Sequence, residues 1–232
     1  MFKIKIAGLV IGIEHKYSYV RALCANYLVD TDQEDFHISV TEQEILEAYT
    51  AGEGVYPLPY CESMCLYYAI SMKLLMYDRF MMHSAVLEVD GQAFVFAANS
   101  GVGKSTHMKL WMDAFGNRAR VVNGDKPVFR FLEGKLYACG TPWCGKEGLE
   151  NNIMSPVRAI CFLERSSENS IRRLEISEVI NRIFNQLLIP LEEEGMNRLM
   201  DMIDRMITTI DCYLLQCNTE PEAALIAYQA MR

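Results

Sequence analysis

One segment organises this chain, and it reads Ala97-Ala98-Asn99-Ser100-Gly101-Val102-Gly103-Lys104-Ser105-Thr106. An apolar run at 93–97 leads into it, and a run compatible with a helix, 106–115, leads out. This order of elements is typical of a phosphate-binding loop: a strand, then a glycine-containing loop, a Lys-Ser pair and a helix. A glycine-rich turn before an ordinary helix is the weaker interpretation, because both flanking signals agree with the motif.

The loop departs from the usual pattern, G-x-x-x-x-G-K-[ST], at one position, where Ala98 replaces the first glycine. The chemistry survives this change, because the anion nest is built from backbone N–H groups at 100–105, at the start of a helix. Lys104 would reach the terminal phosphates of a nucleotide, and the Ser105 hydroxyl would bind Mg²⁺. The residues expected to bind nucleotide are Asn99, Ser100, Gly101, Val102, Gly103, Lys104, Ser105 and Thr106.

Composition narrows the class of protein. The 232 residues are 51% hydrophobic and 22% charged, which suits a globular protein with a real core. A net charge of −8 argues against a nucleic-acid partner but leaves ATP open, because a local nest binds phosphate on an acidic protein. The eight scattered cysteines favour reduced thiols in a cytoplasmic protein, and no apolar run reaches membrane-spanning length.

The region before the loop divides into two parts. Residues 1–60 predict a small α+β region rich in strands, with a helix that begins at the capping box Thr41-Glu42-Gln43-Glu44. Residues 61–232 predict the domain that carries the loop. It opens with a helix at 61–80, whose Met and Tyr side chains we assign to core packing, although they could also form an interface between copies of the chain.

A hairpin feeds the loop. Strands at 81–89 and 92–97 flank Asp90-Gly91, a strong signal for a two-residue hairpin turn. A general Rossmann-like ATPase or metabolite kinase would instead feed its loop from a strand reached by a parallel crossover. The hairpin therefore favours a mixed, largely antiparallel sheet over the Rossmann-like alternative.

The remainder predicts short strands followed by helices. Strands are expected at 120–122, 128–132, 135–139, 157–163 and 212–217, and helices at 176–188, 192–210 and 220–231, the last with Thr219 as N-cap. Residues 141–152 read as a polar loop.

Asp125 is the best candidate for the carboxylate that a phosphate-transfer site needs. It follows a short apolar strand about twenty residues after Lys104, in the turn Asn123-Gly124-Asp125-Lys126-Pro127. A purely structural role in that turn is the alternative.

Four features together resemble the kinase domain of HPr kinase/phosphorylase, whose nucleotide core is shared with phosphoenolpyruvate carboxykinases. They are His83 before the hairpin, the loop itself, the turn at 123–127, and the stretch Gly140-Thr141-Pro142-Trp143-Cys144-Gly145-Lys146. The resemblance covers about residues 80–230. It implies an α/β fold with a mixed, largely antiparallel sheet around the phosphate-binding loop, preceded by the small N-terminal region.

The resemblance also implies an activity, transfer of a phosphoryl group from ATP, with Mg²⁺, to a serine or another hydroxyl of a peptide, protein or small molecule. Asp125 would serve as base or metal ligand beside Ser105, His83 would lie near the phosphates, and Lys146 would lie on the substrate side. Relatives assemble into rings, so a homo-oligomer is a further expectation.

Two departures from the family pattern favour a second hypothesis. The family commonly has paired acids at the turn, but here Gly124 takes the first position, and Cys144 stands where relatives often carry an acid. A lone carboxylate is hard to use as both base and metal ligand. The chain could then be a nucleotide-binding, catalytically weakened relative that acts as a peptide- or partner-binding module.

Overall fold

The computed structural model describes residues 1–232. It contains three β-hairpins with the same type of two-residue turn. Their two-residue turns are Ala7-Gly8, Asp90-Gly91 and Glu133-Gly134, and φ is positive at both residues of each turn. This backbone matches the twist of the strands on either side, and it explains why glycine occupies the second place every time. The Asp90-Gly91 hairpin confirms the prediction made from the sequence.

The first hairpin belongs to a small N-terminal sheet with the strand order β3-β1-β2-β4. Its strands are β1 (Phe2–Ile6), β2 (Leu9–Ile13), β3 (Leu28–Val29) and β4 (Phe36–Ile38). The helices beside it are α1 (Ser18–Leu23), α2 (Glu42–Ala51) and α3 (Leu58–Leu75), and a short 3₁₀ turn, η1 (Ala25–Tyr27), follows α1. We call this group the N-terminal lobe. The expected division between residues 60 and 61 falls inside α3, which packs against the small sheet through Leu66, Ile70 and Leu74.

The main sheet is mixed and largely antiparallel. Its order is β5-β9-β10-β11-β7-β6-β8, and β13 extends it from β11 and carries β12. The strands are β5 (Arg79–Met81), β6 (Ser84–Val89), β7 (Gln92–Ala97), β8 (Ala119–Asn123), β9 (Val128–Leu132), β10 (Lys135–Cys139), β11 (Met154–Arg165), β12 (Ser170–Arg173) and β13 (Asp211–Cys217). Only β11 pairs in parallel within this sheet, with β7 on one side and β13 on the other.

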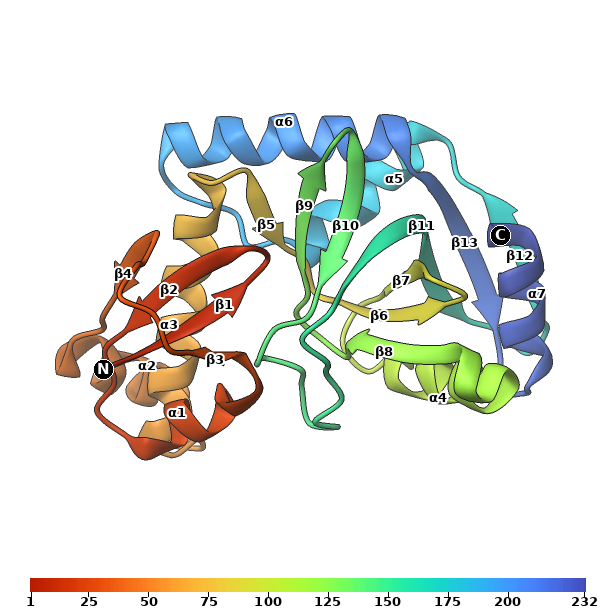
Figure 1. The fold of residues 1–232 in the computed structure, drawn as a ribbon. Coiled ribbons are helices and arrows are strands. Elements are labelled where there is room, and N and C mark those ends of the chain that lie inside the picture. Colours follow the sequence, from red (N-terminus) through yellow and green to blue (C-terminus); the bar gives the residue numbers. More distant parts are fainter.

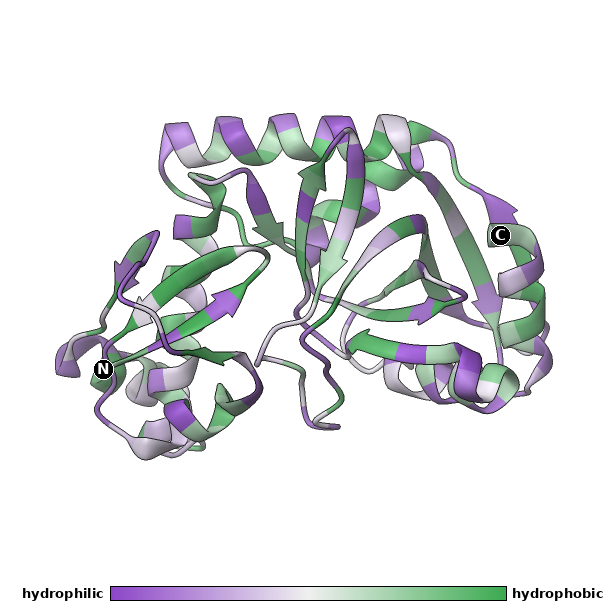
Figure 2. Cartoon of the chain, in the orientation of Figure 1, coloured by the Kyte–Doolittle hydropathy of each residue, from purple (hydrophilic) through white to green (hydrophobic).

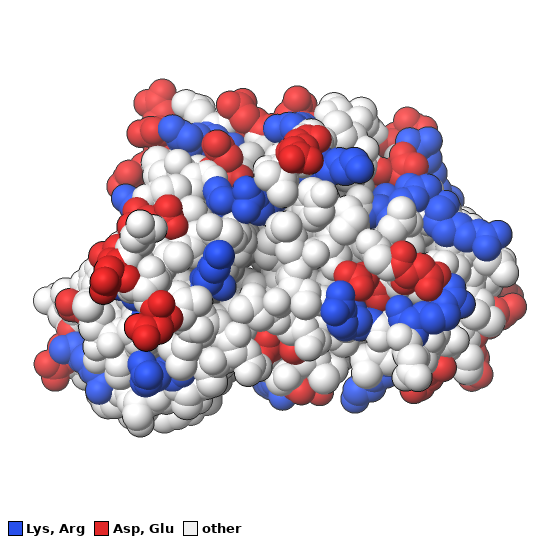
Figure 3. All heavy atoms as spheres, viewed as in Figure 1, with Lys and Arg blue, Asp and Glu red and all other residues white.

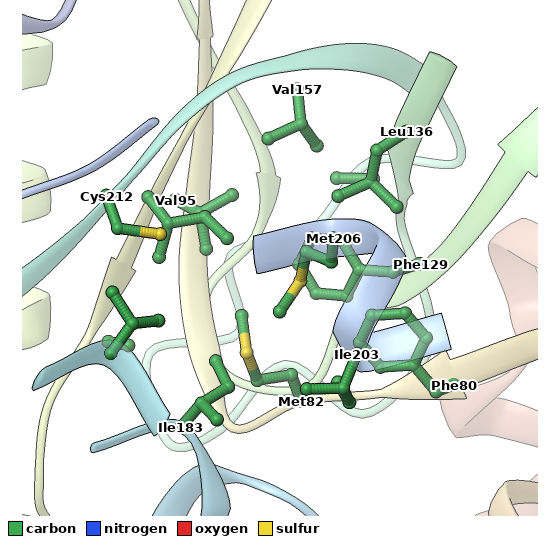
Figure 4. Packing of buried hydrophobic residues seen from close by; sticks show 14 of the residues in the cluster. Phe80, Met82, Val95, Phe129, Leu136, Val157, Ile183, Ile203, Met206 and Cys212 are labelled. Carbon is green, nitrogen blue, oxygen red and sulfur yellow. The ribbon is translucent and has the colours of Figure 1, made fainter. Parts of the chain in front are cut away.

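Helices cover both faces of the main sheet (Figure 1). They are α4 (Lys104–Phe115), α5 (Ile176–Ile183), α6 (Glu193–Thr209) and α7 (Glu222–Met231), with short 3₁₀ turns η2 (Gly116–Arg118) and η3 (Phe184–Gln186). Helices α5 and α6 bury one face, where Phe129, Ile203 and Met206 meet (Figure 4). Helices α4 and α7 bury the other face, around Trp111. Apolar residues line the strands between the two helical layers (Figure 2).

The structure differs from the sequence prediction at several elements. The strand expected at 81–89 is two strands, because the N–H groups of His83 and Ser84 donate to Gln186 O (2.7 Å) and Asp125 O (2.9 Å) instead of continuing a ladder. Thr219 does not cap α7, whose N-cap is Pro221, so that prediction was wrong. Strand β12 was missed, because its sequence is short and charged and only its pairing with β13 makes it a strand.

None of the helices is long and apolar enough to cross a membrane.

The capping box at the start of α2 yields the first prediction. The Thr41 side chain accepts from Glu44 N (3.2 Å), and the Glu44 carboxylate accepts from Thr41 N (2.7 Å). We expect Thr41→Ala to lower the free energy of unfolding by about 1 kcal/mol in urea titrations. Thr50→Ala in the same helix is the matched control, because its hydroxyl only bonds back to Leu46 O. Equal losses in both variants would contradict the assignment.

Candidate nucleotide-binding and active site

Three loops converge at one edge of the main sheet because β6 is antiparallel to both of its neighbours. Ser84 at the start of β6 lies opposite Ala97 at the end of β7, and Val86 pairs with Asn123 at the end of β8. The segment before β6, the loop after β7 and the turn after β8 therefore meet. These three segments carry His83, the phosphate-binding loop and Asp125, so the topology brings together the residues that the sequence singled out.

The candidate phosphate-binding loop, residues 99–106, has the positive φ angles that an anion nest would need. Gly101 and Gly103 have φ of 80° and 126°, a region that L side chains rarely adopt, and nothing lies within 4 Å of where their Cβ atoms would be. Asn99, Ser100 and Gly101 are exposed. Helix α4 begins at Lys104, so its first N–H groups and the positive end of its dipole face this open loop.

Arg165, at the end of β11, holds the loop through two hydrogen bonds to its backbone. Its Nε donates to Val102 O at 3.0 Å, and its Nη2 donates to Gly101 O. A guanidinium that binds these carbonyls holds the peptide planes with the carbonyls turned toward it. These two bonds give Arg165 a role in shaping the loop.

Lys104 is buried, with 8% of its surface exposed, and its Nζ donates to Ala98 O at 2.9 Å. Burial lowers the pKa of Lys104, while the nearby Asp125 carboxylate partly restores it. The backbone carbonyl of Ala98, the residue that replaces a glycine of the usual motif, thus binds the ammonium group of Lys104. Ser105 and Thr106 follow in the first turn of α4, half-buried and exposed respectively.

Asp125 forms a compact charged group with two neighbours. His83 Nε2 lies 3.0 Å from Asp125 Oδ1, and Lys126 Nζ lies 2.8 Å from Asp125 Oδ2. Burial raises the pKa of Asp125, but the hydrogen bonds from His83 and Lys126 outweigh it and hold the pKa at about 2. The carboxylate is therefore ionised at neutral pH. A group so acidic is suited to orient a partner or bind a cation rather than to remove a proton.

Asn123 fixes the turn that presents Asp125. Its Oδ1 accepts from the N–H groups of Asp125 (2.9 Å) and Lys126 (2.7 Å), and its Nδ2 donates to Thr141 O (2.9 Å). The Thr141 hydroxyl in turn donates to Lys126 O at 2.8 Å. Because Asn123 is fully buried, this hydrogen-bond network holds the backbone of the turn in one conformation.

Gln186, a buried residue of η3, was missed by the sequence analysis. Its side-chain amide, oriented to satisfy its neighbours, donates to Ala98 O (3.2 Å) and His83 O (3.1 Å). It therefore ties the phosphate-binding loop to the segment that carries His83. The only sequence signal was a glutamine next to Asn185 in a region predicted as one continuous helix, and that signal is too weak to predict a site residue.

Gly124 explains why the first acid of the turn is absent. A Cβ at this position would lie 3.0 Å from Cys144 O and 3.3 Å from Leu149 O, and Gly124 N donates to Leu149 O at 3.0 Å. The loop at 140–153 is thus packed directly on the turn. An aspartate could not be accommodated unless that loop moved.

The same loop is anchored to the N-terminal lobe. Trp143 Nε1 donates to Ser63 O at 3.1 Å, and the Glu150 carboxylate accepts from Tyr27 and Asn26. Cys144, expected where relatives carry an acid, is a buried thiol whose pKa burial raises. Both lobes therefore contribute to the position of the loop beside Asp125.

Lys146 lies in the exposed tip of this loop and contacts no acidic group. Its neighbour Gly145 packs closely on Asp125, since a Cβ there would lie 3.0 Å from Asp125 Cβ. The structure thus brings the backbone beside Lys146 to the site, while the role of its side chain stays a prediction. No group of three or more His, Cys, Asp or Glu side chains is arranged to hold a metal ion.

Asp125 and Ser105 have oxygen atoms that are free to bind Mg²⁺. Each oxygen of Asp125 accepts one hydrogen bond, which leaves acceptor capacity on both, and the Ser105 hydroxyl is half-exposed. One carboxylate and one hydroxyl are a set that Mg²⁺ uses when phosphate oxygens and water complete its shell. The residues present therefore fit the ion in the presence of a nucleotide.

His107 provides a prediction about the helix that starts the site. It is 3% exposed, its Nε2 accepts from Trp111 Nε1 at 3.0 Å, and burial lowers its pKa to about 4. The unfolded chain binds a proton at His107 below its ordinary pKa of about 6.5, while the folded chain does not until about pH 4, so stability falls as the pH falls through this window.

We expect the pH dependence at His107 to cost about 2 kcal/mol of unfolding free energy between pH 7 and pH 5. His107→Gln should remove this part of the slope in urea titrations, because glutamine can still accept from Trp111 but does not titrate. His37→Gln at the surface is the control. If the wild-type chain and His107→Gln lose stability in parallel, His107 is not buried in the neutral form.

Comparisons with known proteins were made by sequence and by structure. No family model matches the chain, and no curated protein matches its sequence. Among solved structures, the Hpr(Ser) kinase/phosphatase from Coxiella burnetii is similar, with 12% sequence identity and a TM-score of 0.36, over 65% of this chain and 93% of that one.

Proposed function

We propose that this chain is an ATP-dependent phosphotransferase that acts on a serine or another hydroxyl of a peptide, protein or small molecule. The observation that supports it is the placement of an ionised Asp125, bonded to His83, at the same sheet edge as an open phosphate-binding loop. A loop that only stored a nucleotide would not need this pair. We further propose that the core is of the phosphoenolpyruvate carboxykinase and HPr kinase type.

In this proposal the loop at 99–106 holds the phosphates of ATP through its backbone N–H groups. Lys104 exchanges its bond to Ala98 O for the terminal phosphates, a short movement for a side chain already at the loop. Ser105 and Asp125 hold Mg²⁺, which, when bound, neutralises charge on the phosphates. Lys146 adds positive charge from the loop at 140–153, whose backbone reaches Asp125.

The His83–Asp125 pair prepares the acceptor. Asp125 is too acidic to serve as the base, since its pKa of about 2 leaves it ionised throughout the neutral range. It instead fixes the imidazole through Nε2, which leaves Nδ1 of His83 to accept the proton of the attacking hydroxyl. The sequence predicted that Asp125 serves as base or metal ligand, and this proposal keeps the metal-ligand role for Asp125 and assigns the base to His83.

A second function is favoured by the packing at Gly124. The backbone of the loop at 140–153 excludes a second acid, and Lys126 already neutralises Asp125. A site with one compensated carboxylate binds Mg²⁺ weakly. The chain would then bind a nucleotide and recognise a peptide or partner without fast transfer.

Variants of three residues separate these functions. We expect Lys104→Ala to weaken ATP binding about tenfold or more in calorimetry, because a buried charged contact is lost. His83→Gln and Asp125→Asn should bind ATP within a few-fold of wild type yet lower ATP turnover, with water as acceptor, by about 10²- to 10⁴-fold. Lys109→Ala, an exposed residue of α4, is the control.

The outcomes point in different directions. If wild type binds ATP but shows no turnover, and His83→Gln behaves identically, the binding-module function holds and the kinase is rejected. If Lys104→Ala binds ATP as tightly as Lys109→Ala does, the loop is not the nucleotide site and both functions fail.

A further inference from the structure

Two arginines face each other where the N-terminal lobe meets the main sheet. Arg79 on β5 and Arg130 on β9 are directly opposite in the antiparallel register of these strands. Like charges at such a position repel and normally destabilise a sheet. Neither arginine forms a salt bridge, whereas Arg118, Arg120, Arg172 and Arg198 elsewhere in the chain each pair with a carboxylate.

Both guanidinium groups converge on the tip of the β1–β2 hairpin. Ala7 O accepts from Arg79 Nε (3.0 Å) and from Arg130 Nη1 (2.8 Å). Ala7 has a φ of 49°, a left-handed conformation that non-glycine residues adopt at a cost. The arginines thus clamp a turn that is strained and that belongs to the other lobe.

Gly8 packs directly against the two arginines. A Cβ on Gly8 would lie 2.5 Å from Arg130 Nη1 and 3.8 Å from Arg79 Nη2, so any side chain there would displace the Arg130 guanidinium. Figure 3 shows basic atoms beside the hollow between the lobes on the face that it draws. Both arginines are half-exposed, so a small solute can reach them.

Donor groups remain without protein partners. Arg130 Nε is buried and donates to no protein atom, and Arg79 commits only Nε and Nη1, to the carbonyls of Ala7 and Tyr77. Burial lowers the pKa of Arg79, and Arg130 lowers it further. Asp35 and Asp78 are close enough to raise the pKa of Arg79, but neither forms a salt bridge with it, since Asp35 accepts from Val10 N and Asp78 pairs with Arg198.

We propose that Arg79 and Arg130 form a binding site for a phosphate dianion, either inorganic phosphate or the phosphate group of a small metabolite, at the junction of the two lobes. The two guanidinium groups carry two positive charges and form no salt bridge with a carboxylate. One phosphate dianion would balance both charges, whereas one monocarboxylate would balance only one of them. The planar fork of each arginine matches phosphate oxygens in pairs. An anion bound here relieves the repulsion and ties β5 and β9 to the β1–β2 hairpin.

This site is independent of the proposed function, because Arg79 and Arg130 bond to Ala7 and Tyr77 and to no residue of the loop at 99–106. The test therefore uses the Lys104→Ala chain, in which phosphate binding at the loop is weakened. Phosphate, glycerol phosphate, acetate and chloride are each titrated at constant ionic strength and pH 7.5, and the melting temperature and calorimetric affinity are measured. Phosphate and glycerol phosphate distinguish the free ion from a phosphate-bearing metabolite.

We expect phosphate to raise the melting temperature more than acetate or chloride does. Arg130→Gln and Arg79→Gln, each added to Lys104→Ala, should weaken phosphate binding about tenfold or more. Arg120→Gln, which removes an exposed arginine paired with Glu88, should leave it unchanged. Arg130→Lys keeps the charge and protects the fold, yet should also weaken binding because the fork is lost.

Two results would overturn the proposal. Either the Arg130 variants bind phosphate as tightly as the Arg120→Gln control does, or phosphate stabilises the chain no more than acetate does at the same ionic strength. In either case the arginines serve only to clamp the hairpin.

Discussion

The pairing of β6 with β7 on one side and β8 on the other is the constraint on which the candidate site depends. Because both pairings are antiparallel, the start of β6 lies beside the ends of β7 and β8. Most residues of β6 and β7 are buried, as are the last three residues of β8, so the register is held by the core rather than by the loops. The loops are then free to carry polar residues, and Gln186 and Asn123 lock those residues in place.

The loop at 140–153 links this edge to the rest of the molecule. It packs on Gly124 and Asp125, and it is anchored on the N-terminal lobe through Trp143 and Glu150. A movement of the N-terminal lobe would therefore shift the part of the loop at 140–153 that packs on Asp125. The clamp of Arg79 and Arg130 on the first hairpin provides a second connection between the lobes, at the other end of the small sheet.

Much of the fold was predictable because local signals agreed with the tertiary structure. The hairpin at Asp90-Gly91, the strands Val128–Leu132 and Lys135–Cys139 and the capping box at Thr41 all follow from short-range chemistry. The break at Met82-His83 and the strand β12 did not, because distant segments supply their hydrogen-bond partners.

The candidate site was predictable to a similar degree. The motif pointed to the loop and to Asp125 as candidates, since residue types at fixed spacing carry that chemistry, and the structure places these candidates at one edge of the sheet. The sequence could not reveal that Asp125 is held at low pKa by His83 and Lys126, nor that Gly124 is closed by backbone from another loop. Both facts depend on tertiary structure, which brings distant segments together and orients the side chain of Lys126 toward Asp125.

A crystal structure of the chain with ADP, Mg²⁺ and beryllium fluoride tests the central claim most directly. The account predicts that the nucleotide phosphates occupy the loop at 99–106 and that Lys104 Nζ leaves Ala98 O for them. It also predicts that His83 keeps its bond to Asp125, with the fluoride group facing this pair. A nucleotide bound elsewhere, with Lys104 still on Ala98 O, would contradict it.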